Sequence, residues 1–431
     1  MIDKKILILT YYWPPAGGAG VQRWLKFVKY LSKLGFELHI FTPENPEAPA
    51  FDDSLLKDVP ANAIIIKKPI WEPFEIFKKL TNKKGNLNAG FLSEEKKNKA
   101  KWSEKLALFV RANLFIPDAK MFWIRPSVHF LKQYIKDEKI ELVISSGPPH
   151  SLHLIALKLQ KILAIKWVAD FRDPWTNIDF YKELPTLKLV DKYLHKLEKK
   201  VLQKADRVIV VGSQMKKEFN TIAPQSHIEI ITNGFDSDIA QNAVLDTKFS
   251  IVHIGSINAD RNHESFYKAI HHLVEENKSF KNSLQIKFIG KVDFEVKETV
   301  SKYQLEPYVE FIKYIPYDQI SAIQQSARLL YLPLNNTPNA KGILTGKFFE
   351  YLSAKRPIIA QGPKDGDVAN ILNDTQAGFI FDFDDENTLK EEIKNQFQQF
   401  LDGKTYFESQ CIDQYSRENL TKKLVEILDA I

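Results

Sequence analysis

The feature that most limits the fold of this chain is a repeated order of segments: a short apolar run, a loop of glycine or polar residues, and an amphipathic stretch. Residues 5–10, KILILT, form an apolar run of the kind that is buried in a parallel sheet. A glycine-containing loop and a helical pattern at 21–34 follow. This order is the repeating unit of a doubly wound α/β sheet. The predicted strands are 5–10, 36–41, 64–67, 140–145, 165–169, 208–211, 228–231, 251–254, 284–289, 309–312, 329–333 and 357–360.

The order occurs in two series, separated by a polar stretch without periodicity at 237–248. A chain of 431 residues is long for a single core, so more than one domain is expected. We predict two doubly wound domains, at 1–240 and 246–410. The remaining segment, 411–431, carries apolar residues on one helical face and is predicted to pack back on the first domain. Residues 70–135 interrupt the order and are interpreted as a helical insertion.

Composition narrows the class of protein further. The single cysteine, Cys411, excludes an internal disulfide and a cysteine-based metal cluster, and it fits a reducing compartment. No apolar run approaches the roughly 18 residues of a transmembrane helix. The first residues, MIDKKILILT, do not have the pattern of a signal peptide. We therefore expect a cytoplasmic protein.

The net charge of +6 is concentrated in one segment. Residues 78–105 contain nine lysines and three glutamates, so their surplus equals that of the whole chain. A nucleic-acid-binding protein would be more evenly basic, so we expect no nucleic acid partner. Lysines interleaved with Trp and Phe in the insertion suggest a surface that touches an anionic membrane. The alternative is a solvated loop above ordinary core aromatics.

Three loops of the first domain follow strands and should converge, because ligands of open α/β sheets bind beyond the carboxyl ends of the strands. They are the glycine loop with Gly17, Gly18 and Gly20, the SGPPHS loop with His150, and the DFRDPW loop with Asp170. His150 has a helix-capping or core position as its alternative. The glycines do not form GxGxxG and no acidic residue ends the second strand, so a dinucleotide-dependent dehydrogenase is disfavoured.

The second domain contains TGKFFEYLSAKRPII, which reads as a loop, a short helix and a buried strand. Thr345 can be the N-cap, with its hydroxyl accepting from an orphan amide of the first turn. The amides after Gly346 and the ammonium of Lys347 would attract a diphosphate. Glu350, one turn further in, could accept from the two hydroxyls of a sugar, and the combination describes a nucleotide. The alternative is a surface pair between Lys347 and Glu350.

In their order and spacing these segments resemble the retaining family-four glycosyltransferases, which have the GT-B architecture. The resemblance covers nearly the whole chain and implies two Rossmann-like domains facing each other across a cleft. It would place a nucleotide-sugar in the second domain and the acceptor in the first. The segments that carry it are YYWPPAGGAGVQR, SGPPHS, DFRDPW, NGFD, GSINADR, FIGK and TGKFFEYLSAKRPII.

The resemblance also implies roles for individual residues. Glu350 would bind the ribose hydroxyls, and Arg261 and Lys347 would hold the diphosphate and stabilise it as a leaving group. His150 and Asp170 would touch the transferred sugar or the acceptor. The residues implied to bind the donor are Gly17, Gly18, Gly20, Gly255, Ser256, Arg261, Gly290, Tyr314, Ile315, Thr345, Gly346, Lys347 and Glu350.

The chain departs from the family pattern at two positions. The family commonly has two glutamates eight residues apart, and the earlier position is Gly342. A basic residue often follows the glycine that corresponds to Gly255, and here it is Ser256. Two other functions therefore stay open: a non-catalytic subunit that binds a nucleotide-sugar, and a nucleotide-sugar epimerase.

The function implied is transfer of a sugar from a nucleotide-diphosphate sugar to a glycan or lipid-linked acceptor, with retention, in cell-surface polysaccharide or glycolipid synthesis. No paired-aspartate metal motif stands out, so we predict no metal and no other cofactor. Asp365 and Asp367 are interpreted as part of the turn after 357–360. We expect the enzyme in the cytoplasm, peripheral on the inner face of the plasma membrane.

Overall fold

The structure is a computed structural model that describes residues 4–48, 51–72, 102–178, 181, 184–236, 243–313, 315, 317–405 and 407–431. It consists of two compact units. Unit 1 comprises the described residues of Met1–Leu87 and Ala100–Thr232 together with Arg417–Ile431. Unit 2 comprises the described residues of Asn233–Ser416. Along the described residues, the chain therefore passes from unit 1 to unit 2 at Asn233 and returns to unit 1 at Arg417.

Unit 1 is built on a seven-stranded parallel sheet in the order β3-β2-β1-β4-β5-β6-β7. Its strand order reverses between β1 and β4, where open α/β sheets bind ligands. The strands are β1 (Lys5–Leu9), β2 (Glu37–Pro43), β3 (Ile64–Lys68), β4 (Leu142–Gly147), β5 (Lys166–Phe171), β6 (Arg207–Val210) and β7 (Ile228–Ile230). The helices are α1 (Ala19–Lys33), η1 (Asp53–Asp58), α3 (Trp102–Leu114), η3 (Met121–Trp123), α4 (Ile124–Asp137), α5 (Ser151–Leu163), α6 (Lys188–Lys204), α7 (Ser213–Ile222) and α15 (Arg417–Asp429).

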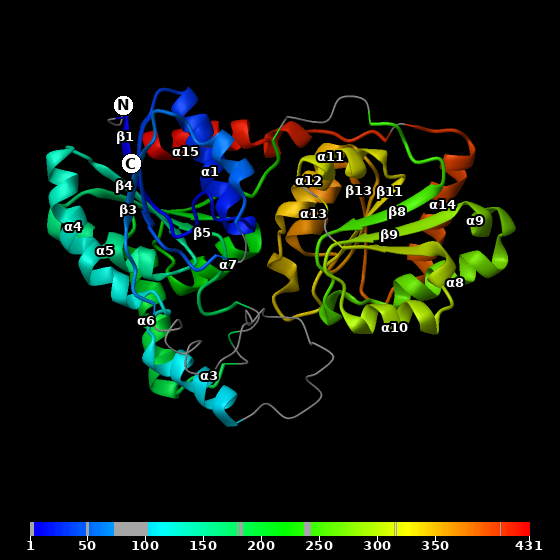
Figure 1. Cartoon of the computed structure of the whole chain (residues 1–431), viewed down its shortest axis with the longest axis horizontal. Helices are drawn as coiled ribbons and strands as arrows, with labels where there is room; N and C mark the ends of the chain where they lie inside the picture. The colour runs from blue at the N-terminus through cyan, green and yellow to red at the C-terminus, as the bar shows by residue number, and fades with distance from the viewer. Residues whose placement is uncertain are drawn as a thin grey trace. The chain divides into compact units, whose positions relative to one another are not determined.

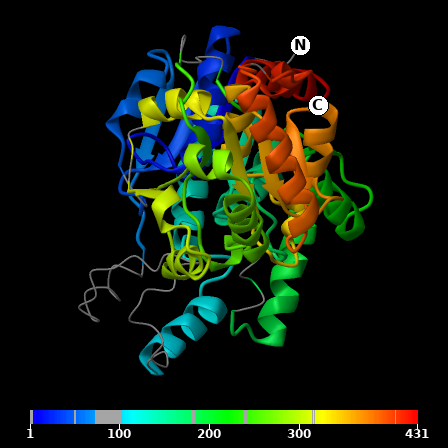
Figure 2. The ribbon, with the colours of Figure 1, turned by 90° about the vertical axis from the view of Figure 1, so that its right-hand side faces the viewer.

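Each face of this sheet is covered by a separate apolar cluster. On one face, Leu420 and Leu424 of α15 join Leu25 and Val28 of α1 in a common core with the strands. Both views show α15, in red, beside α1, in blue (Figures 1 and 2). On the other face α4, α5, α6 and α7 cover the sheet. The last helix of the chain is therefore an integral part of unit 1.

Unit 2 repeats the arrangement with a six-stranded parallel sheet in the order β10-β9-β8-β11-β12-β13. The strands are β8 (Phe249–Ile254), β9 (Leu284–Ile289), β10 (Val309–Ile312), β11 (Leu329–Pro333), β12 (Ile358–Gln361) and β13 (Gly378–Phe381). The helices are η5 (Ala259–Arg261), α8 (Glu264–Glu276), α9 (Lys278–Ser283), α10 (Phe294–Lys302), η6 (Glu306–Tyr308), α11 (Tyr317–Ser326), η7 (Ala340–Gly342), α12 (Gly346–Ala354), α13 (Asp367–Thr375), α14 (Glu386–Leu401) and η8 (Ile412–Tyr415).

The helices of unit 2 also divide between the two faces of their sheet. Helices α8, α10 and α14 pack on one face, and α11, α12 and α13 on the other (Figure 1). Two parallel sheets with helices on both faces are the predicted doubly wound α/β fold, and the prediction of fold class is confirmed.

The structure differs from the sequence-based boundaries in two places. Strand β13 was not predicted, because it is only four residues long and begins with Gly378. Glycine is required there, since a Cβ atom would lie 2.1 Å from the Ile358 carbonyl oxygen. Unit 2 runs from Asn233 to Ser416 rather than from 246 to 410, and a parallel bridge between buried Phe235 and Ser416 joins its two ends. The lysine-rich part of the predicted insertion, 73–101, lies outside the described residues.

Candidate functional site

The first turn of α12 in unit 2 faces open space. A Cβ atom at Gly346 would have no atom within 4 Å, so there is room for a ligand beside the start of the helix. Thr345 is the N-cap residue, as predicted, with extended backbone angles of φ −78° and ψ 150°. Its hydroxyl does not cap the helix, however, and Oγ1 is buried without a hydrogen-bond partner in the described part of the chain. The start of α12 therefore has room for a ligand beside it and a buried hydroxyl that lacks a partner, although the Phe348 amide already donates to the Thr345 oxygen at 3.2 Å.

The side chain of Lys347 lies directly over Gly255, at the end of β8. A Cβ atom at Gly255 would lie 2.0 Å from Lys347 Nζ and 2.2 Å from Cε, and Gly255 has φ +119°. Gly290 is packed against the backbone of Gly255 in turn, because a Cβ there would lie 2.7 Å from the Gly255 oxygen. Both glycines are therefore needed to seat the lysine. The predicted residues Gly255, Gly290 and Lys347 are brought together.

The electrostatic surroundings of Lys347 lower its pKa to about 7. Burial is the main cause, the charge of Arg261 adds to it, and Glu350 opposes it. No hydrogen bond or ion pair to Lys347 is found within the described ranges, so the alternative of a Lys347–Glu350 surface pair is not formed. His253 beneath it stays neutral, since burial and the Lys347 charge hold the His253 pKa well below its ordinary value. His253 was missed by sequence reasoning.

Arg261 and Glu350 are held beside this turn by neutral groups. Arg261 donates to Asn335 Oδ1 at 2.6 Å and to the Ser256 oxygen at 2.9 Å. Gln324 Nε2 lies 3.5 Å from Glu350 Oε2, one turn into α12. Ser256 thus contributes its carbonyl group, which orients Arg261, rather than a charge. Two cationic side chains, a helix N-terminus and a carboxylate one turn further in form an arrangement suited to a nucleoside diphosphate.

Asp170 ends β5, as expected, but its carboxylate lies in the interior of unit 1. It is 0% exposed and accepts from Arg23 Nη2 at 2.8 Å, Trp24 Nε1 at 2.7 Å and Ser146 Oγ at 2.9 Å. Burial would raise its pKa, but the charge and hydrogen bonds of Arg23 hold the pKa of Asp170 below its ordinary value. Its geometry supports a positioning role rather than the predicted contact with a ligand.

The loops of unit 1 converge through a residue that sequence reasoning missed, Arg172. Arg172 Nη1 donates to the Gly20 oxygen at 2.8 Å, and its Nη2 donates to the Pro148 oxygen. It thereby joins the glycine loop, the SGPPHS loop and its own DFRDPW loop. A Cβ atom at Gly20 would lie 2.8 Å from Arg172 Nη1, which explains that glycine. The signal was available, because Arg172 stands between two aspartates at a strand end.

His150 is the N-cap residue of α5 and stacks on Trp175, with ring centroids 4.5 Å apart. Burial, with the nearby His153 and Arg172, holds the pKa of His150 well below its ordinary value. Its Nδ1 is buried and has no partner in the described chain. The ring is therefore a neutral imidazole stacked on Trp175, able to donate or accept one hydrogen bond at Nδ1. Asp118, which sequence reasoning missed, caps α5 by accepting from Ser151 N at 2.8 Å.

The remaining predicted residues divide between described and undescribed positions. Gly17 is buried, and Gly18 precedes α1 with φ +97°. Ile315 packs against the core of unit 2. Tyr314 lies outside the described residues.

One group in the described residues has metal-ligand geometry, formed by Glu37, His39 and Glu138 of unit 1. Both ring nitrogens of His39 are already used, with Tyr134 Oη at 2.7 Å and Glu37 Oε1 at 3.0 Å. Lys5 Nζ lies 3.0 Å from the same Glu37 oxygen. Glu37 and His39 are thus already paired with neighbouring side chains, which favours a structural role over a metal site.

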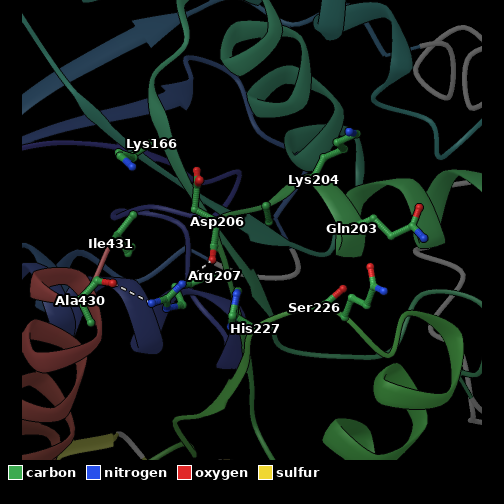
Figure 3. A pocket seen from close by; sticks show the side chains of 11 residues that line it. Lys166, Gln203, Lys204, Asp206, Arg207, Ser226, His227, Ala430 and Ile431 are labelled. Carbon is green, nitrogen blue, oxygen red and sulfur yellow. Dashed lines mark hydrogen bonds between the residues drawn. The ribbon is translucent and has the colours of Figure 1, made fainter.

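A polar hollow of about 400 Å³ lies at the other edge of the unit 1 sheet, at the amino ends of β5 and β6 (Figure 3). Arg207 donates there to the Ala430 oxygen at 2.6 Å and so holds the end of α15. Asp206 Oδ2 accepts from Trp167 N at 2.8 Å. These side chains hold strands and helix ends together. The hollow lies at the amino ends of the strands, whereas the predicted ligand-binding loops follow their carboxyl ends.

Comparisons with known proteins agree with the fold and identify the class. HepE of Anabaena in complex with UDP has a TM-score of 0.63 at 13% identity, covering 99% of this chain and 100% of that one. A glycosyltransferase from Rickettsia africae gives 0.63 at 14% identity, with 99% and 98% covered. An S. aureus TarM variant in complex with fondaparinux, alpha-GlcNAc-glycerol and UDP gives 0.59 at 12%, with 99% and 100% covered. No curated protein matches the sequence.

Two family matches lie one in each half of the chain. Residues 94–239 match Glycosyltransferase Family 4, and residues 248–399 match Glycosyl transferases group 1. The chain is therefore a glycosyltransferase of the GT-B class, built from these two family domains. No helix within the described ranges is both long and apolar enough to span a bilayer.

Proposed function

We propose that this glycosyltransferase moves a sugar from a nucleotide-diphosphate sugar to a glycan or lipid-linked acceptor, with retention and without a metal. We place this transfer in the synthesis of a cell-surface polysaccharide or glycolipid, on the cytoplasmic side of the membrane. The first turn of α12 carries the proposal. It combines a helix N-terminus with open space beside Gly346, the unpartnered Thr345 hydroxyl and the Lys347 ammonium, all of which favour a diphosphate.

The solved neighbours support the choice of donor. HepE of Anabaena is described in complexes with UDP and with UDP-glucose, and the TarM variant in a complex with UDP. A uridine diphosphate sugar is therefore the first donor to test on this chain. Glu350 lies one helical turn from the diphosphate site, which suits a carboxylate that accepts from the ribose hydroxyls.

The chemistry that we assign to this site is electrostatic. Departure of a nucleoside diphosphate leaves negative charge on its terminal phosphate, and the α12 amides with Lys347 and Arg261 would stabilise that charge. In unit 1, the neutral His150 ring would donate one hydrogen bond to the sugar or acceptor. Asp170 would act indirectly, because it fixes Arg23 and the Ser146 hydroxyl beneath the SGPPHS loop.

Binding of UDP, GDP and ADP, measured by thermal shift and titration calorimetry, tests the donor site. A bound nucleotide raises Tm by mass action. We expect Glu350→Gln to weaken the bound nucleotide about tenfold or more, since charge-assisted hydrogen bonds contribute roughly 1.5–3 kcal/mol. Glu391→Gln, an exposed glutamate on α14, is the matched control and should bind normally. Equal affinities for all three proteins would remove Glu350 from the site.

A second candidate, a non-catalytic subunit that binds a nucleotide-sugar, is favoured by the surroundings of Gly342. This glycine ends η7 in place of the family's first glutamate, and the neighbouring Lys341 is paired with Asp365 at 2.5 Å. Slow hydrolysis of the bound donor by the purified chain would exclude that candidate. Donor binding with neither hydrolysis nor transfer to any glycan or lipid-linked acceptor tested would support it.

A further inference from the structure

Large apolar side chains are exposed together at one end of unit 1, on α3, on α6 and at the residue that precedes α6. Leu189 is 82% exposed, Leu114 66%, Leu187 52% and Tyr193 51%. Both views place α3 and α6 at the lower end of unit 1 (Figures 1 and 2). We call these four residues the α3–α6 patch. Single exposed apolar residues are ordinary, but such a group marks a binding surface.

The patch is fixed in place by one buried side chain, Asn113. Its Nδ2 donates to the Pro185 oxygen at 2.9 Å and to the Phe109 oxygen at 2.8 Å, and its Oδ1 accepts from Leu187 N at 2.7 Å. The amide therefore joins the end of α3 to the start of α6. Because Asn113 satisfies backbone groups of both segments, the exposed leucines are held in a defined arrangement rather than on a loose loop.

The exposed face of α6 carries lysines around the apolar residues. At ~100° per residue, Leu189 and Tyr193 lie on the face opposite buried Leu194 and Val201. The lysines of that same exposed face are Lys192, Lys196 and Lys200. None of these lysines has an ion pair within the described ranges. Among the described residues, this face therefore carries a positive charge without paired acidic groups.

We propose that the α3–α6 patch docks on the interface of an anionic membrane. Apolar side chains surrounded by unpaired lysines match a bilayer surface, which offers acyl chains below a layer of negative phosphates. The leucines and the tyrosine would insert at the headgroup level, and the lysines would contact the phosphates. This inference does not require sugar transfer, and it uses residues outside the lysine-rich segment at 78–105.

Pelleting of the purified full-length chain with vesicles tests the proposal, without any sugar donor. Vesicles of phosphatidylcholine alone are compared with vesicles that also contain phosphatidylglycerol. We expect binding only to the anionic vesicles, and we expect it to fall with added salt. The apolar variant Leu114→Gln, Leu187→Gln, Leu189→Gln and the basic variant Lys192→Gln, Lys196→Gln, Lys200→Gln should each lose about tenfold or more in affinity.

Matched control variants lie in unit 2. Leu401→Gln replaces a comparably exposed leucine, and Lys278→Gln, Lys281→Gln, Lys404→Gln removes three exposed lysines. Both should bind vesicles like the wild type, and all variants should keep the wild-type circular dichroism and Tm. Equal loss in the control and patch variants would overturn the proposal, as would salt-independent binding. Self-association that the apolar variant abolishes would instead make the patch an interface between two copies and would also overturn it.

Discussion

At the scale of single residues, Lys347 links the candidate site to pH. Its folded pKa of about 7 lies below the ordinary lysine value because burial and Arg261 disfavour the charge. Between pH 7 and the ordinary lysine pKa, the unfolded chain binds more protons than the folded one. This group therefore makes the ligand-free protein more stable as pH rises through that window, and less stable at and below pH 7.

Lys347→Met should remove this pH-dependent destabilisation of the ligand-free protein. We expect the ligand-free variant to melt a few degrees higher than wild type at pH 6–7, with the difference shrinking toward pH 10, as followed by thermal melts. The same variant should lose most of its affinity for nucleoside diphosphates, because the charged ammonium is what the anion uses. Wild-type affinity should fall as pH rises from about 6 to 9, since Lys347 then loses its proton. Lys281→Met is the control, and an identical pH profile in both variants would contradict the assignment.

Asp170 and Arg23 form the other charge-dependent prediction at this scale. Asp170→Asn leaves the buried Arg23 guanidinium without its counter-ion, while its bonds to the carbonyls of Ile231 and Thr232 remain. We expect a loss of about 3–5 kcal/mol in the free energy of unfolding, as for other broken buried pairs. The depressed pKa of Asp170 also predicts that wild type loses this stabilisation as pH falls below about 4.

Urea titrations at pH 7 and at about pH 2.5, below the ordinary aspartate pKa, measure both effects of Asp170→Asn. The difference between wild type and variant should narrow at the lower pH. Glu418→Gln, which breaks an exposed pair with Lys422 on α15, should leave the unfolding midpoint unchanged. A variant as stable as wild type at pH 7 would show that the pair does not hold unit 1 together.

At the scale of elements, a substitution in α15 can test whether the C-terminal end of the chain stabilises unit 1. Leu424 is fully buried against α1 and the strands. Leu424→Ala should cost about 2–5 kcal/mol through lost burial and the cavity left behind. Calorimetry should show the loss in the melting of unit 1, while the melting of unit 2 moves little. A shift confined to unit 2 would contradict the assignment of α15.

The same elements show what the sequence could and could not predict. Apolar runs such as KILILT define central strands because both faces of a parallel sheet are buried, so the two sheets followed from the pattern. Strand β13 carries only four residues and a glycine, too little for periodicity to detect. The first turn of α12 was predicted from Thr345, Gly346 and Lys347, whose chemistry is local.

The tertiary roles of other site residues were out of reach of local patterns. Whether a charged residue at a strand end faces solvent or the interior depends on partners distant in the sequence. Asp170 is buried because Arg23, 147 positions earlier, neutralises it. The charge of Lys347 lowers the pKa of His253, and Arg172 donates a hydrogen bond to Gly20. In both pairs the two residues are far apart in the sequence. Such pairs are decided by the packing of the whole unit.

At the scale of the whole molecule, the charges near the candidate donor site predict a metal-independent enzyme. A hard divalent cation that bridges a diphosphate needs carboxylate oxygens. The groups at the first turn of α12 are Thr345, Gly346 and Lys347, with Arg261 beside them, so an added cation would meet like charge. Of the two aspartates nearest in sequence, Asp365 is paired with Lys341 at 2.5 Å, and Asp367 begins α13 in a buried position.

Donor hydrolysis or sugar transfer in excess chelator measures this property directly. We expect the rate in chelator to equal the rate without it, because amides and two cationic side chains replace the metal in stabilising the leaving diphosphate. Lys347→Met should lower the rate by about 10²-fold or more in either condition, as the loss of one oxyanion-stabilising donor does elsewhere. If chelator abolishes turnover and magnesium or manganese restores it, carboxylates must approach the diphosphate from other residues, and the electrostatic assignment of Lys347 and Arg261 is wrong.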